Sequence, residues 1–181
     1  MKLKFVFILL SQTCILNAQL SNKVRTLAKP LDTISFAESS HIGIDGEESK
    51  IYNSFKKLSK TATNNELYYF AKNGSNALKL YSSKELLKRN DKRFIEIYKY
   101  YSDNLLQMKY REGCVGKRED IAYYLKSELY SAKEIISIRD SLLLKKNRSQ
   151  SSNAQLKSIK EEGYSKIRQK DLEYFLKEIE K

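Results

Sequence analysis

This sequence contains few of the residues that form disulfide cross-links or bind metal ions in small proteins. Its 181 residues include two cysteines, one histidine, one proline and no tryptophan. Cys14 lies in an apolar N-terminal segment, so Cys114 is the one cysteine expected in the folded domain, and an internal disulfide is excluded. A structural zinc site needs several Cys or His ligands and is excluded as well. The domain must therefore be stabilised by packing alone.

The scarcity of histidine and cysteine also argues against catalysis. His41 lies away from any acidic cluster, which favours a solvent-facing loop histidine over a metal ligand or general base. Cys114 has no convincing histidine partner, so we expect it to be a buried, small hydrophobic side chain rather than a nucleophile. Adjacent carboxylates occur at 47–48, 119–120 and 161–162. Because neighbours on a helix point about 100° apart rather than toward a shared substrate, we expect these pairs to be capping or solvated charges. Because no Gly-rich phosphate loop is present either, the sequence predicts a protein that is not an enzyme and uses no cofactor or metal.

The N-terminus has the pattern of an export signal. Lys2 and Lys4 precede an apolar run that ends near Leu16, and Ala18 is followed by a polar residue. The run is shorter than the roughly 20 apolar residues of a membrane span, and this pattern is typical of a secretory signal peptide. We predict that residues 1–18 are removed, that Cys14 leaves with them unacylated, and that the protein is periplasmic or secreted.

The chain is strongly basic. Its formal net charge is +12, and it stays clearly positive after the two signal-peptide lysines leave. Such an excess favours polyanions, namely nucleic acid, anionic lipid or acidic glycan, but it also keeps a small protein soluble. Because the lysines are spread along the chain, a solvated surface is the favoured interpretation.

The remaining chain of about 160 residues is long enough for one domain. Residues 19–48 contain Pro30, Gly43 and Gly46 without sustained periodicity, and we predict an irregular N-terminal segment there. Residues 49–181 repeat apolar positions at intervals of three and four, which indicates helices. The predicted helices are 51–61, 64–73 after a Thr63 capping box, 77–89, one from Asp91 to about 102, one from 118 with a bend near 131, and a final one around 172–179. Residues 103–117 are predicted as a loop or short extended stretch.

These features predict an all-α fold of short antiparallel helical hairpins, arranged as a stack or an irregular bundle. From Ile51 to about Tyr130 the order of elements resembles exported HEAT-repeat-like proteins of Bacteroidetes-type bacteria. Glu66-Leu67, Ala77–Tyr81, Leu86 and 113–115 carry this resemblance. The resemblance implies a HEAT-like array that binds through an extended concave surface, and it supplies no catalytic residue.

Thirteen tyrosines are the most distinctive feature of the mature chain. Tyr81, Tyr98 and Tyr124 lie on the apolar stripes and are expected to pack in the core, whereas Tyr69, Tyr100 and Tyr123 are candidates for exposed partner contacts. The sequence therefore predicts an exported, non-enzymatic binding or scaffold protein that uses a helical surface for a protein or cell-envelope partner. The alternative is a basic protein that binds a polyanion.

Overall fold

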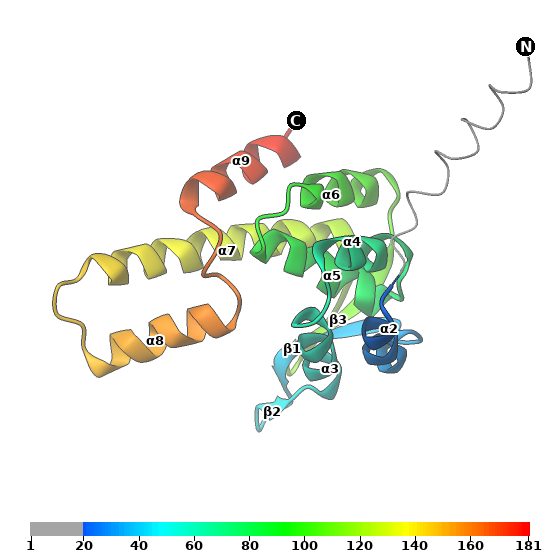
Figure 1. The fold of residues 1–181 in the computed structure, drawn as a ribbon, viewed down its shortest axis with the longest axis horizontal. Helices are drawn as coiled ribbons and strands as arrows, with labels where there is room; N and C mark the ends of the chain where they lie inside the picture. The colour runs from blue at the N-terminus through cyan, green and yellow to red at the C-terminus, as the bar shows by residue number, and fades with distance from the viewer. Residues whose placement is uncertain (1–19) are drawn as a thin grey trace, which may run out of the picture.

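The computed structural model describes residues 20–181, so the predicted signal peptide lies outside the described residues. Figure 1 shows the helices and strands in chain order. The helices are α2 (Asn22–Ala28), the 3-10 helix η1 (Lys29–Leu31), α3 (Lys50–Ser59), α4 (Asn64–Asn73), α5 (Asn76–Lys88), α6 (Arg93–Asp103), α7 (Ile121–Leu144), α8 (Gln150–Glu161) and α9 (Gln169–Ile179). The strands are β1 (Phe36–Ile42), β2 (Glu47–Glu48), β3 (Gln107–Gly113) and β4 (Val115–Asp120).

The strands form one four-stranded sheet, so the prediction of an all-α fold was wrong. The strand order is β2-β1-β3-β4, with β1 parallel to β3 and the other neighbours antiparallel. The parallel pair joins residues 36–42 to residues 107–113, far apart in sequence. A regular stack of helical hairpins contains no such sheet.

Two segments without a strong apolar pattern provide the strands. The N-terminal segment predicted as irregular contains α2, η1, β1 and β2, and Val24, Ala28 and Leu31 anchor it in the core. In β3 only Met108 and Tyr110 alternate toward the interior, while Lys109 and Arg111 are exposed. Period-two alternation over so few residues is a weak signal, which explains why the strands were missed.

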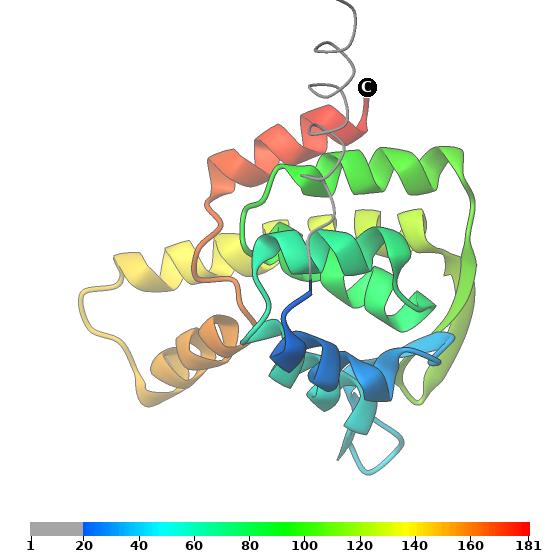
Figure 2. The same ribbon diagram turned by 45° about the vertical axis from the view of Figure 1, so that its right-hand side comes forward.

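One hydrophobic core joins the helices to the sheet. Figures 1 and 2 show α6 and α9 side by side above the long helix α7, where the rings of Phe94 and Phe175 meet edge to face at 5.6 Å. The C-terminal half of α7 forms a hairpin with α8, and this hairpin extends away from the sheet. Within residues 20–181, no helix is long and apolar enough to span a membrane.

Several predicted helix boundaries are confirmed. The Thr63 and Glu66 capping box is present at the start of α4, and Ser75 caps α5. Helix α4 ends at Asn73, as predicted, and Gly74 follows it with a φ of −74°. Glycine is needed there because a Cβ would lie 2.6 Å from the Cβ of Leu78. The predicted bend near Ser131 is not found, since α7 is one continuous helix.

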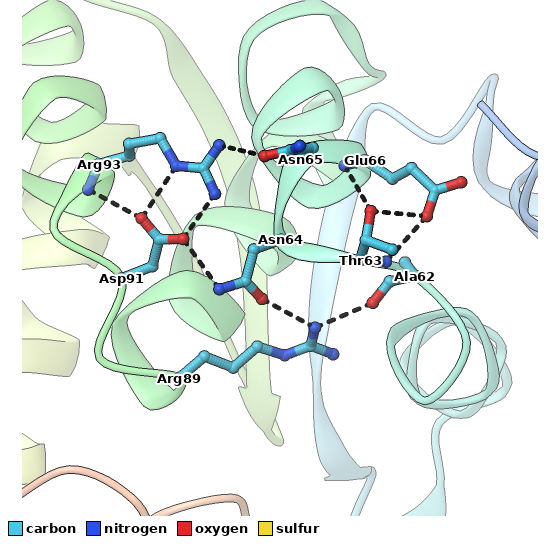
Figure 3. A network of polar contacts seen from close by, with 8 residues as sticks. All are labelled: Ala62, Thr63, Asn64, Asn65, Glu66, Arg89, Asp91 and Arg93. Carbon is cyan, nitrogen blue, oxygen red and sulfur yellow. Dashed lines mark hydrogen bonds and ion pairs between the residues drawn. The ribbon is translucent and has the colours of Figure 1, made fainter. Parts of the chain in front are cut away.

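A polar network fixes the corner where α3, α4, α5 and α6 meet (Figure 3). The Arg89 guanidinium donates to the carbonyl of Ala62 at 2.9 Å and to Asn64 Oδ1 at 3.1 Å. Asn64 in turn donates to Asp91, which also accepts from the side chain of Arg93. Because these polar groups satisfy one another and backbone carbonyls near the end of α3, the network is structural.

Candidate functional site on the third and fourth strands

The β3–β4 hairpin sorts its side chains onto two faces with different chemistry. Lys109 lies opposite Arg118, and Tyr110 lies opposite Lys117. Because successive side chains of a strand point to opposite faces, the first pair shares one face and the second pair shares the other. The ring of Tyr110 faces the helices and lies 5.2 Å from that of Tyr124 in α7. The side of Tyr110 is therefore the inner face of the sheet, and the side of Lys109 is the outer face.

The outer face concentrates positive charge. Its exposed Lys109, Arg111 and Arg118, together with the half-buried Phe36 of β1, are defined here as the basic face. Phe36 pairs with Lys109, which is opposite Arg118, so these three residues form a row across the sheet. Arg111 lies opposite Gly116, which has no side chain. A hollow of about 450 Å³ opens on the surface at this point. Every residue that lines this hollow belongs to β1, β3 or β4, so no helix covers it.

Carboxylates compensate only part of the charge on the basic face. A guanidinium nitrogen of Arg111 is 3.4 Å from Glu38, which also accepts a 2.6 Å hydrogen bond from Ser49. Lys109 and Arg118 form no ion pair with any other residue of the described chain. Like charges directly opposite on neighbouring strands destabilise a sheet. The opposed pair of Lys109 and Arg118 therefore lowers the stability of the sheet locally, and the fold does not depend on it.

Behind the sheet, a buried ion cluster joins α5 to α7. Lys84 and Lys88 of α5 place their ammonium groups 3.0 and 3.4 Å from the two carboxylate oxygens of Glu128, and all three side chains are 13–15% exposed. The Tyr164 hydroxyl donates to the same carboxylate. Burial alone would raise the pKa of Glu128, but the two ammonium groups and the phenol outweigh it and lower the pKa to about 2. Glu128 is thus a carboxylate at all physiological pH values.

A pocket of about 360 Å³ opens between this cluster and the inner face. It is defined here as the inner pocket. Its aromatic and aliphatic walls are Tyr110, Tyr123, Tyr124 and Val115, and its polar lining is Lys84, Glu112, Lys117, Ser127, Glu128 and Ser131. The pocket thus combines charged groups, hydroxyls and aromatic surfaces, which is the composition of a site for a small polar molecule.

The three predicted contact residues lie on three different helices, α4, α6 and α7. Tyr69, Tyr100 and Tyr123 are 36%, 44% and 52% exposed. Tyr123 lines the inner pocket. Tyr100 lies on α6, where Lys72 of α4 approaches its ring to 5.4 Å. Tyr69 packs its ring against Phe70.

The remaining residues considered for chemistry are accounted for as follows. His41 is exposed on β1, with its imidazole 3.1 Å from the Ser40 hydroxyl. Cys114 is exposed between β3 and β4, so the prediction that it is buried was wrong. The reason is that Cys114 lies in the tight turn between β3 and β4, at the end of the hairpin, where residues 114–116 are exposed. In residues 20–181, no three His, Cys, Asp or Glu side chains are grouped to hold a metal ion.

No protein family, curated protein or solved structure matches this chain. The resemblance to HEAT-repeat-like proteins therefore stays a prediction as far as family membership is concerned. The function must be inferred from the site itself.

Sequence reasoning missed the residues that define both faces of the hairpin. The signal for the basic face was the alternation of Lys109 and Arg111 with Met108 and Tyr110. The signal for the buried cluster was Lys84, a charged residue that interrupts an apolar helical stripe. Such interruptions mark either a mispredicted face or a buried charge, and only the tertiary structure distinguishes the two.

Proposed function

We propose that this protein is an exported, non-enzymatic binding protein and that its basic face binds an acidic polymer. An acidic glycan is the partner that best fits a periplasmic or secreted location. The observation that carries this proposal is the cross-strand pair of Lys109 and Arg118, two exposed cations placed opposite each other without a carboxylate partner among residues 20–181.

The spacing of Lys109 and Arg118 suits an anionic ligand. Directly opposite residues in a sheet lie about 5 Å apart, so one anionic group above the row can contact both cations. Arg111 lies two residues further along β3, about 7 Å away, where it can meet the next anionic group of a polymer. Neutralising several cations at once releases counterions and favours binding at low salt.

Phe36 and Gly116 shape the surface for a ring. Phe36 is at the end of the row with Lys109, and its half-buried ring offers an apolar platform beside the charges. Gly116 removes a side chain that would fill the hollow opposite Arg111. Aromatic surfaces next to basic side chains are a common feature of sites that bind sugars or bases within a polyanion.

Binding to an acidic glycan is tested by titrating the purified protein with a fluorescent heparin-derived hexasaccharide between 50 and 200 mM salt. The expected result is saturable binding that weakens steeply as salt rises. Single-stranded DNA and vesicles with anionic lipid serve as comparators. If one of these binds more tightly than the hexasaccharide, the glycan assignment is wrong, and if none binds at 50 mM salt, the polyanion proposal fails.

A second proposal assigns a protein or envelope partner to the helical surface of α4 and α6. Its specific support is a stack in which Lys72 lies 5.4 Å from the ring of Tyr100 and 5.5 Å from that of Tyr68. This arrangement holds the exposed Tyr100 ring in place, and fixed aromatic side chains are frequent anchors in interfaces. Replacing Tyr100 by Ala should then weaken capture of a partner from envelope extract more than replacing Lys109 by Ala. The opposite ranking favours the basic face.

A further inference from the structure

The inner pocket is separate from the basic face and has the size of a small-molecule site. The two hollows lie on opposite faces of the β3–β4 hairpin and share only Tyr110 and Lys117 at their margins. A volume of about 360 Å³ is at the lower end of the range for ligand sites. A monosaccharide-sized molecule fits this volume, whereas a polymer does not.

Unused hydrogen-bonding groups line this pocket. Ser127 and Ser131 are four residues apart and therefore lie on one face of α7. Their hydroxyls, and those of Tyr110 and Tyr123, form no hydrogen bond to another residue within 20–181, whereas Tyr124 donates to the Lys117 carbonyl at 3.1 Å. Several free hydroxyls around one small hollow suit a ligand that has several hydroxyls of its own.

The charges around the pocket leave room for one anion. Lys84 gives one of its three N–H donors to Glu128, and its ammonium lies 4.7 Å from the centre of the Tyr110 ring. Lys88 shares Glu128, and Lys117 and Glu112 line the pocket mouth. Within the pocket lining, the two ammonium groups of Lys84 and Lys117 meet two carboxylates, and Lys88, which lies outside the lining, adds a third ammonium group on Glu128, so that the cluster and pocket together carry one excess positive charge. An excess positive charge in a partly desolvated site is relieved by a bound anion.

We propose that the inner pocket binds a small hydroxylated carboxylate of the sugar-acid class, with its carboxylate near Lys84 and Lys117 and its hydroxyls on Ser127 and Ser131. The ring of such a ligand packs against Tyr123 and Tyr124. This proposal does not depend on binding at the basic face, so it is tested separately from the proposed function.

The test is a calorimetric titration of the purified protein with D-glucuronate, compared with D-glucose and with acetate. A charge-assisted hydrogen bond is worth about a tenfold change in affinity, so glucuronate should bind at least about tenfold more tightly than glucose, which lacks the carboxylate. It should exceed acetate, which lacks the hydroxyls, by a similar factor. The proposal is overturned if glucuronate does not bind, or if acetate binds equally well.

Three variants locate the binding. Ser131→Leu fills the pocket from an exposed helical position, and Ser141→Leu makes the same change at an exposed position of α7 outside the pocket. Ser131→Leu should weaken glucuronate binding about tenfold or more, while Ser141→Leu should leave it unchanged, with both proteins folded by circular dichroism. Equal affinities in the two variants contradict a site in this pocket. Lys117→Gln should reduce the preference for glucuronate over glucose, and an unchanged preference contradicts the assigned carboxylate position.

Discussion

Replacing Glu128 by Gln should strongly destabilise the protein. Glu128 is 13% exposed and lies between the ammonium groups of Lys84 and Lys88. Its pKa of about 2 compares with an ordinary value of 4.5, which corresponds to roughly 3 kcal/mol of stabilisation at neutral pH. Removing one partner of a buried ion pair costs about 3–5 kcal/mol, in agreement with this value.

The assay is urea denaturation at several pH values. Because the pKa of Glu128 is depressed in the folded state, its contribution is complete above the unfolded pKa and is lost as pH falls toward about 2. The difference between wild type and Glu128→Gln should therefore be about 3 kcal/mol at pH 7 and should shrink between about pH 5 and pH 2.

Glu134→Gln is the matched control, because Glu134 is an exposed carboxylate on the same helix. It should change the free energy of unfolding by less than about 0.5 kcal/mol. If the two variants are equally stable at pH 7, or if the Glu128 difference does not depend on pH, the reasoning about the buried cluster is refuted.

Three further changes test other parts of the structure. Cys114→Ser should alter the free energy of unfolding by less than about 0.5 kcal/mol, and in the folded wild type a thiol reagent should label Cys114 at the rate of a free thiol; protection from the reagent would contradict its exposure. Arg89→Ala should cost about 3 kcal/mol in urea denaturation, since charged hydrogen bonds to the end of α3 are lost; a cost under about 1 kcal/mol would show that water replaces them. Gly74→Ala should lower the free energy of unfolding by about 1–3 kcal/mol, because the added methyl group would collide with Leu78. A neutral effect would mean that α4 and α5 can move apart at no cost.

Local chemistry made part of the fold predictable. The capping box at Thr63 and the cap at Ser75 depend on side chains within three residues of the helix start, so they are visible in the sequence. In the helical stripe of α6, Phe94, Ile97 and Tyr101 are buried as their spacing predicts, while Tyr98 is half-buried and packs against the core. These features need no information about distant parts of the chain.

Long-range pairing made the rest unpredictable. The strand β1 exists because residues 36–42 pair with residues 107–113, and neither segment has an apolar run that would identify it as a strand. The candidate site depends on the same pairing, since Phe36 joins Lys109 and Arg118 only across the sheet. Likewise, Lys84, Lys88 and Glu128 become a cluster only when α5 packs against α7, whereas the exposed Tyr100 and Tyr123 were identified from helical periodicity alone.

The most direct test of the basic face compares two double variants with the same change in net charge. One is Lys109→Ser with Arg118→Ser, and the other is Lys145→Ser with Lys146→Ser, at exposed positions after α7. Removing the opposed cations should leave the free energy of unfolding unchanged or raise it by up to about 1 kcal/mol, because like charges no longer face each other. It should also weaken binding of the heparin-derived hexasaccharide at least about tenfold and lower the dependence of log affinity on log salt by about 2, while the control variant changes each by much less. Equal losses of affinity in the two variants would show that net charge alone governs binding, and would contradict a site on the sheet.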